Sequence, residues 1–207
     1  MGMKMSITLD THSEEETIAL GSNLGVILDG GAVVLMDGDL GAGKTRLAQG
    51  IAKALGVEVP VTSPTFNLVL EYPLPAPAQA AGLRLLRHFD LYRLDNASDL
   101  EDLDYFGLIE QQDAISLVEW GNKFPDRLPL DYLLVVLTVG EDDPNLRVVE
   151  LSAAGAHSKE LLEQLAEQIA GQFVEQLAEQ LAEQLAEQLA EELVEQHIEH
   201  KAEHEAE

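Results

Sequence analysis

The chain has 207 residues, 46% of them hydrophobic, which favours one globular domain with a core over a disordered chain. It contains no cysteine, and this excludes disulfides, thiolate metal sites and cysteine nucleophiles. Twelve basic against 38 acidic residues give a formal net charge of −26. Because proteins bind phosphate backbones mainly through Lys and Arg, we do not expect this chain to bind nucleic acid by itself.

The N-terminal segment has no long apolar run behind its charge, so it does not resemble a secretory signal. No window reaches the roughly 18 apolar residues that a membrane span requires. Together with the absence of cysteine, these features favour a cytoplasmic protein that has no membrane partner.

Residues 1–156 alternate between strand and helix patterns, which predicts an α/β domain. Two capping boxes, Ser13 with Glu16 and Ser98 with Glu101, indicate helix starts. The Pro- and Ala-rich segment Pro73–Gly82 is expected to be a loop. The expected strands are 7–9, 32–36, 66–72, 83–92, 115–118, 132–139 and 146–151, and the expected helices are 13–28, 44–55 and 98–111.

Residues 157–207 form a separate low-complexity segment, in which Glu-Gln-Leu-Ala repeats in tandem over residues 175–190. Its residue types are strong helix formers, so a long C-terminal helical extension is predicted. A period of four advances the leucine stripe by about 40° per repeat and holds no coiled-coil seam. Two interpretations stay open: an arm for self-association, or a solvated extension of a shorter helix.

The segment between the second expected strand and the second expected helix reads Gly38-Asp39-Leu40-Gly41-Ala42-Gly43-Lys44-Thr45 and matches the Walker A pattern. Its glycines let backbone N–H groups surround a phosphate, Lys44 reaches the terminal phosphates, and the Thr45 hydroxyl can bind Mg²⁺. The following helix directs its positive end at the anion. We therefore expect ATP or ADP with Mg²⁺ as ligand.

A phosphate-loop enzyme also needs a carboxylate near the metal, commonly at the end of an apolar strand. Asp90 and Glu119 each follow such a strand, and either could be a metal or water ligand. Thr65, in the segment Ser63-Pro64-Thr65, is a candidate γ-phosphate sensor, because Pro64 stiffens the turn that presents its hydroxyl. Each of these signals is also compatible with an ordinary strand terminus.

The segments GDLGAGKT, VTSPTFNLVLEY, HFDLYRL and LVEW occur in this order, and the set resembles the TsaE family, formerly YjeE. The resemblance covers about residues 5–152. It implies a P-loop NTPase-type fold, with three layers around a central mixed sheet. It also implies an ATPase required for threonylcarbamoyladenosine modification of tRNA, which acts with the proteins TsaD and TsaB. Direct tRNA binding by this chain alone is not expected.

Residue by residue, the resemblance assigns nucleotide binding to the Walker A segment, with Arg46 next to it and Trp120 near the nucleotide. Lys44 would contact the phosphates, and Asp90 would act in hydrolysis as a metal or water-positioning carboxylate. Thr45 and Glu119 would coordinate Mg²⁺. Many family members carry an acidic residue two places after the tryptophan, where this chain has Asn122, so a carboxylate role there is not assigned.

Two other functions share the Walker A motif. A small-molecule kinase would need an acceptor pocket and usually a lid, and the only long irregular segment, residues 73–82, has no charged residue. A nucleotide-binding scaffold without a catalytic role would rely on the C-terminal repeat. No arginine finger is evident within the motifs, although Arg46 and Arg93 lie nearest to them.

Overall fold

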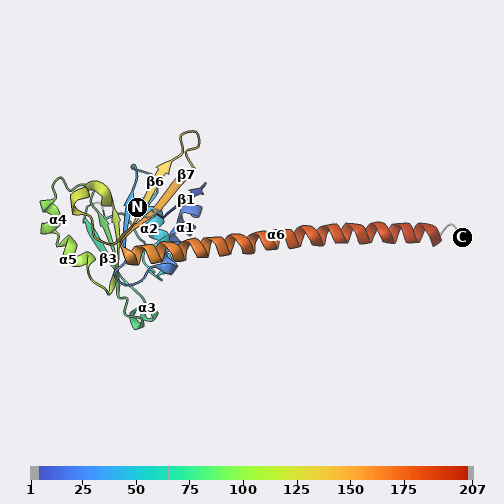
Figure 1. Ribbon diagram of the computed structural model, residues 1–207, viewed down its shortest axis with the longest axis horizontal. Coiled ribbons are helices and arrows are strands. Elements are labelled where there is room, and N and C mark those ends of the chain that lie inside the picture. Colours follow the sequence, from blue (N-terminus) through green and yellow to red (C-terminus); the bar gives the residue numbers. More distant parts are fainter. Residues whose placement is uncertain (1–4, 65, 205–207) are drawn as a thin grey trace. The chain divides into compact units, whose positions relative to one another are not determined.

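The computed structural model describes residues 5–64 and 66–204, and its centre is a seven-stranded mixed sheet (Figure 1). The strand order is β1-β7-β6-β2-β5-β4-β3. Strands β6, β2, β5 and β4 run parallel, while β1, β7 and β3 pair antiparallel at the two edges. The strands are β1 Ser6–Thr11, β2 Val33–Asp37, β3 Val69–Pro73, β4 Leu85–Asp90, β5 Ala114–Glu119, β6 Tyr132–Val139 and β7 Arg147–Ala154.

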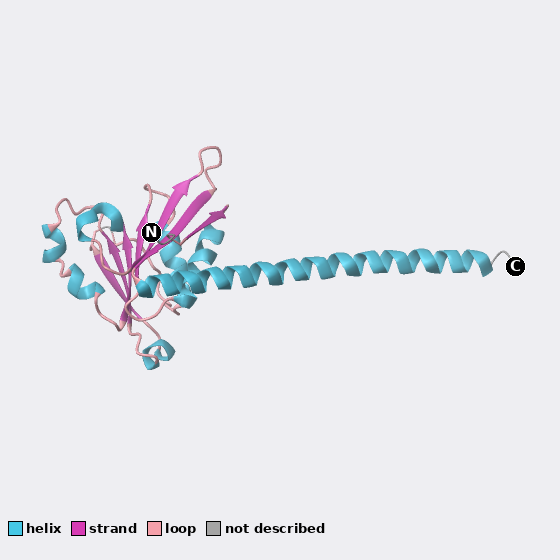
Figure 2. Ribbon diagram, viewed as in Figure 1, coloured by secondary structure: helices cyan, strands magenta, loops and turns pink. Residues whose placement is uncertain are grey.

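Helices cover both faces of this sheet, which confirms the expected three-layer arrangement (Figures 1 and 2). α1 and α2 lie together on one face, and α4 and α5 lie on the other, where they close a core around Phe89. No helix in the described part of the chain is long and apolar enough to span a membrane. The helices are α1 Glu14–Ile27, α2 Lys44–Ala54, α3 Ala76–Ala80, α4 Ser98–Asp102, α5 Tyr105–Ile109 and α6 Ala156–His204, with 3₁₀ turns at Gly121–Lys123 and Pro125–Arg127.

The first predicted capping box is confirmed in its Ser13 half, while the Glu16 carboxylate accepts from the His12 backbone N–H and not from that of Ser13; the second capping box is wrong. Ser13 caps α1 by accepting a hydrogen bond from the Glu16 backbone N–H at 3.1 Å. At α4 the capping position is Ala97, which has no side-chain acceptor. The backbone N–H groups of Asp95 and Asn96, just before this helix, donate instead to the carboxylate of Asp99, the second residue of α4.

The predicted helix 98–111 is broken into α4 and α5 at Asp104, which adopts a left-handed conformation with φ 52°. The break has a packing reason. Leu100 and Tyr105 are both buried in the core around Phe89, although five residues on one continuous helix would place them about 140° apart. The interruption rotates the second segment, so that both side chains reach the same core.

Two further boundaries differ from the sequence prediction. The strand expected from Phe66 begins only at Val69, because Asn67 and Leu68 donate their backbone N–H groups to the Pro64 carbonyl in a turn. The segment expected to be a loop at residues 73–82 contains α3, whose first turn starts after Pro75. Proline is favoured at such helix starts, since its missing N–H would be unpaired there in any case.

Glycines allow α1 and α2 to pack in close contact. A Cβ atom on Gly50 would lie 2.0 Å from the Ile18 carbonyl oxygen, and one on Gly21 would lie 2.3 Å from the Leu47 carbonyl oxygen. Ser22 adds a hydrogen bond from its hydroxyl to the Gly50 carbonyl at 3.1 Å. The two helices therefore approach backbone to backbone, and side chains at these positions would separate them.

The chain divides into two units, residues 1–166 and 167–207. The first turns of α6 belong to the first unit, where Leu161, Leu162 and Leu165 are buried. Asp131 caps this helix, because its carboxylate accepts hydrogen bonds from the backbone N–H groups of His157 and Ser158 at 3.0 and 2.8 Å. In the second unit the exposed apolar side chains, among those whose burial is described, include Phe173, Val174, Leu177 and Leu181.

We expect Gly50→Ala to destabilise the protein by about 1–3 kcal/mol, because the added methyl group collides with backbone rather than with a movable side chain. Urea unfolding monitored by circular dichroism measures this change. Gly171→Ala is the matched control, since a Cβ atom there meets nothing within 4 Å. An unchanged unfolding midpoint for Gly50→Ala would contradict the close packing of α1 and α2.

Asp131→Asn should lower the free energy of unfolding at neutral pH by about 1 kcal/mol, as expected for loss of a charged helix cap. Burial raises the pKa of Asp131, but hydrogen bonds from Ser158 and His157 outweigh it and hold the pKa below its usual value of 3.8. The carboxylate's contribution is therefore complete above pH 3.8 and disappears as the pH falls through the folded-state pKa. Unfolding of the wild type and of Asp131→Asn should be measured at pH 7 and in acid. The difference between their free energies of unfolding should be smaller in acid.

Candidate nucleotide site

The Walker A segment lies where β2 ends and α2 begins, as its sequence context predicts. Gly43 caps α2 with φ 111°, a conformation that strongly favours glycine. Gly38 has φ 133°, and a Cβ atom there would lie 2.2 Å from the Leu137 carbonyl oxygen on β6. The glycines thus let the loop turn tightly against the neighbouring strand and present the positive end of α2 to the adjoining cavity.

Lys44 is nearly buried and lies inside the loop that precedes it. Its ammonium group donates hydrogen bonds to the carbonyls of Gly38 at 2.5 Å and Asp39 at 2.9 Å. Burial lowers the pKa of Lys44 from its usual 10.5, while neighbouring carboxylates oppose this, that of Glu119 most strongly. The ammonium group is therefore a cation surrounded by negative groups, and it is well placed to bind an anionic phosphate.

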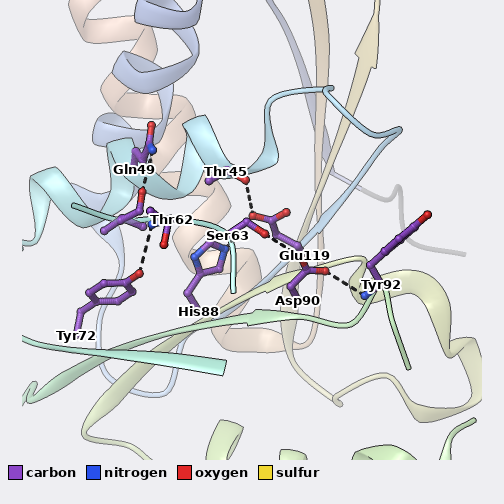
Figure 3. Close-up of polar contacts among 10 residues, drawn as sticks. Thr45, Gln49, Thr62, Ser63, Tyr72, His88, Asp90, Tyr92 and Glu119 are labelled. Carbon is purple, nitrogen blue, oxygen red and sulfur yellow. Dashed lines mark hydrogen bonds and ion pairs between the residues drawn. The ribbon is translucent and has the colours of Figure 1, made fainter. Parts of the chain in front are cut away.

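Glu119 and Asp90 meet at the end of the sheet. They face each other in the parallel register of β4 and β5, and both are almost fully buried. The Thr45 hydroxyl donates to Glu119 Oε1 at 2.8 Å (Figure 3). Asp90 accepts from the Ser63 hydroxyl at 2.8 Å and from the Tyr92 backbone N–H at 3.0 Å. Asp90 and Glu119, which are far apart in the sequence, therefore lie in one site with Thr45 of the Walker A segment.

These oxygen atoms fit a magnesium ion. Mg²⁺ prefers oxygen ligands and is usually held by one or two carboxylates together with phosphates and water, rather than by an all-protein cage. Thr45, Glu119 and Asp90 offer one hydroxyl and two carboxylates at the phosphate loop. Within the described part of the chain, no group of three or more His, Asp or Glu side chains could hold a metal ion by itself. The donor set therefore suits a metal completed by nucleotide phosphates.

Trp120 follows Glu119 directly and adopts a left-handed conformation with φ 60°. Its backbone N–H donates to the Met36 carbonyl at 2.8 Å, which fixes it to the end of β2. The Lys44 ammonium nitrogen lies 4.1 Å from the centroid of the indole ring, within cation–π range. The ring also contacts Tyr92 with a centroid separation of 5.1 Å. The sole tryptophan of the chain thus forms a wall of the site.

A cavity of about 470 Å³ opens over the loop, within the range of small-molecule sites. Seven of the residues that the sequence assigned to nucleotide binding line it, together with both carboxylates. The assigned residues are Leu40, Gly41, Gly43, Lys44, Thr45, Arg46 and Trp120, and the carboxylates belong to Asp90 and Glu119. The carbonyls of Gly38 and Asp39 accept hydrogen bonds from Lys44, and Ala42 of the same loop is buried.

Two predicted residues need separate comment. Thr65, the candidate γ-phosphate sensor, lies outside the described residues. Its neighbour Ser63 does line the cavity and contacts Asp90. Arg46 lines the cavity but pairs with Glu14 of α1 at 2.6 Å, and both side chains are largely exposed.

Sequence reasoning missed part of the cavity wall. Ser13, Glu14 and Thr17 from the start of α1 line it, as do Asn145 and Arg147 from the β6–β7 hairpin. The Arg147 guanidinium donates to the Ala42 carbonyl at 2.9 Å and so holds the phosphate loop from the β6 side. Asn145 and Arg147 belong to no local motif. Only the sheet order, which places β7 next to β6 and β6 next to β2, brings them to the site.

Residues 11–147 match the family model described as "Threonylcarbamoyl adenosine biosynthesis protein TsaE". This chain belongs to the TsaE family. A TsaE from Nostoc sp. is 41% identical over 131 residues, which cover 62% of this chain and 76% of the relative. The TsaE of Bacillus subtilis is 34% identical over 155 residues, covering 74% and 90%. Both are named tRNA threonylcarbamoyladenosine biosynthesis proteins.

A solved structure agrees with this family assignment. The crystal structure of YdiB from Bacillus subtilis superimposes with a TM-score of 0.64 at 30% sequence identity, covering 81% of this chain and 99% of YdiB. The TsaE match ends at residue 147, so it includes every predicted site residue and leaves the repeat segment outside. The P-loop NTPase-type fold and the long C-terminal helix expected from the sequence are both confirmed.

Nucleotide binding should change the fluorescence of Trp120, the only tryptophan, because phosphates that bind Lys44 alter the charge next to the indole ring. Titrating ADP into the protein and recording tryptophan emission tests this. Lys44→Ala should abolish the response to ADP. If calorimetry shows that the wild-type protein binds ADP but its tryptophan emission does not change at saturating ADP, the placement of Trp120 at the site is contradicted.

Proposed function

We propose that the protein hydrolyses ATP with Mg²⁺ and acts on the TsaB–TsaD complex in the threonylcarbamoyladenosine modification of tRNA. The contact of Thr45 with Glu119 carries the hydrolytic part of this proposal, because it joins the Walker A hydroxyl to a buried carboxylate next to Lys44. The family supports the biological role, since TsaE relatives are named for threonylcarbamoyladenosine biosynthesis.

In the proposed reaction each residue has a defined task. Lys44 and the backbone N–H groups of the loop bind the phosphates and offset charge that develops on them. Thr45 and Glu119 hold the magnesium ion, which when bound neutralises phosphate charge. Asp90 orients the attacking water, and the Ser63 hydroxyl fixes its carboxylate. Thr65 is proposed to sense the γ-phosphate from the same loop as Ser63.

A strongly acidic chain is poorly suited to hold tRNA, so we assign RNA binding to partner proteins rather than to this chain. A role that depends on partners also fits a cavity lining in which the described residues include no substrate lid. If the protein were a small-molecule kinase, segment 73–82 would be the candidate lid. This segment contributes no described residue to the cavity wall. Hydrolysis that drives a protein complex requires no second small-molecule pocket.

Hydrolysis should be slow for the protein alone and faster with purified TsaB–TsaD. Lys44→Ala should lose nucleotide affinity as well as turnover, because it removes the phosphate-binding cation. Asp90→Asn should lower kcat by about 100-fold or more while nucleotide affinity persists, because water is no longer oriented. Steady-state phosphate release and calorimetric nucleotide binding separate the two effects.

Asp126→Asn, an exposed carboxylate outside the cavity, is the control and should behave as wild type. Rapid hydrolysis by the isolated protein that TsaB–TsaD does not change would contradict the partner role. Phosphate transfer from ATP to a nucleoside or sugar would favour a kinase instead.

To test the role of the repeat, the point of truncation must be chosen from the structure. Removing residues from 157 onward would delete Leu161, Leu162 and Leu165, which are buried in the first unit. Deletion of residues 171–207 leaves these side chains in place. We propose that hydrolysis and TsaB–TsaD stimulation survive this deletion, so that the α/β domain carries the activity and any self-association belongs to the repeat.

A further inference from the structure

His88 is a buried polar residue of the site that the proposed reaction does not yet use. It lies in the middle of β4, fully buried, two residues before Asp90 and therefore on the same face of the strand. Its Nε2 atom lies 3.0 Å from Glu119 Oε1 on the neighbouring strand (Figure 3). The imidazole is therefore in hydrogen-bonding contact with the carboxylate that is proposed to bind magnesium.

The direction of this hydrogen bond follows from its surroundings. Glu119 Oε1 already accepts the Thr45 hydroxyl at 2.8 Å, so a carboxylate oxygen receives both contacts and Nε2 carries the proton. Nδ1 is buried and has no hydrogen-bond partner among the described residues. An unpaired lone pair at this position costs less than an unpaired N–H, which favours the Nε2–H tautomer.

A histidine here is unfavourable for packing alone. Its neighbours across the sheet are Leu70 and Leu117, so an aliphatic side chain would fill the position without leaving a polar atom unpaired. What the imidazole adds is a second donor to Glu119 Oε1. With Oε1 engaged by Thr45 and His88, Oε2 is the oxygen left for a magnesium ion or a water bound to it.

We propose that His88 is a positioning residue that fixes the rotamer of Glu119 for magnesium binding. The inference rests on the nucleotide and magnesium site proposed above. Side chains that orient a metal-binding residue typically contribute about 10- to 100-fold to metal affinity or activity. His88 acts through Glu119 and does not touch nucleotide or metal itself.

Two substitutions separate the hydrogen bond from the packing. His88→Gln keeps an N–H donor near the position of Nε2, while His88→Met has a similar length and no donor. Leu86→Met is the matched control, because Leu86 is fully buried on the same face of β4 two residues earlier. The readout is the affinity of the full-length protein for a non-hydrolysable ATP analogue, measured by calorimetry with and without Mg²⁺.

In His88→Met we expect the gain in affinity caused by Mg²⁺ to fall by at least about tenfold, with metal-free affinity within about twofold of wild type. His88→Gln should keep the gain within about threefold of wild type, and Leu86→Met should keep it fully. An unchanged gain in His88→Met overturns the proposal. Equal losses in the Gln and Met variants, or loss of metal-free binding, also overturn it, because packing would then be the cause.

A measurement on the unaltered chain avoids dependence on variant folding. In protein labelled with ¹⁵N-histidine, the ring signals of His88 should show a protonated Nε2 and a bare Nδ1. The Nε2 signal should shift when Mg²⁺ and the analogue are added together, and not with the analogue alone. The opposite tautomer, or no shift, overturns the proposal. A wild-type chain that binds Mg²⁺ and analogue but hydrolyses no ATP would refute the ATPase proposal and leave this one intact.

Discussion

The parallel pairing of β2 with β5 is the constraint on which the site depends. Its register places Met36 opposite Glu119, so the strand that leads into the phosphate loop and the strand that carries the proposed metal-binding carboxylate end at the same level. β4 then extends the register by one strand and adds Asp90 opposite Glu119. A slip of one residue would turn each carboxylate to the other face of the sheet, away from Thr45.

Charge makes this arrangement dependent on cations. Two almost fully buried carboxylates and one buried ammonium meet where the sheet ends, in a chain with a large excess of acidic residues. Lys44 compensates part of the negative charge, and its ammonium group donates hydrogen bonds to two carbonyls of the phosphate loop. Buried charges are costly unless paired, so a magnesium ion held by Thr45 and Glu119 would offset negative charge that Lys44 alone does not compensate.

Local chemistry made much of the fold and site predictable. The Walker A segment, the strands ending at Asp90 and Glu119, and the capping box at Ser13 each have a physical meaning within a few residues. The break at Asp104 was not predictable, because it serves core packing between residues that a single helix would separate. Arg147 was also missed, since strand order and not sequence distance brings it to the loop.

The contact between Gly21 and Gly50 joins two parts of the cavity wall. Because α1 and α2 touch through backbone atoms at Gly21, in the middle of α1, the helix whose start lines the cavity is held against the helix that begins at the phosphate loop. The cavity wall also includes Ser63, a loop residue whose hydroxyl contacts Asp90. In the proposed reaction, a rearrangement at the γ-phosphate would reach Ser63 through this hydroxyl–carboxylate contact, whereas α1 and the helix of the phosphate loop would respond together.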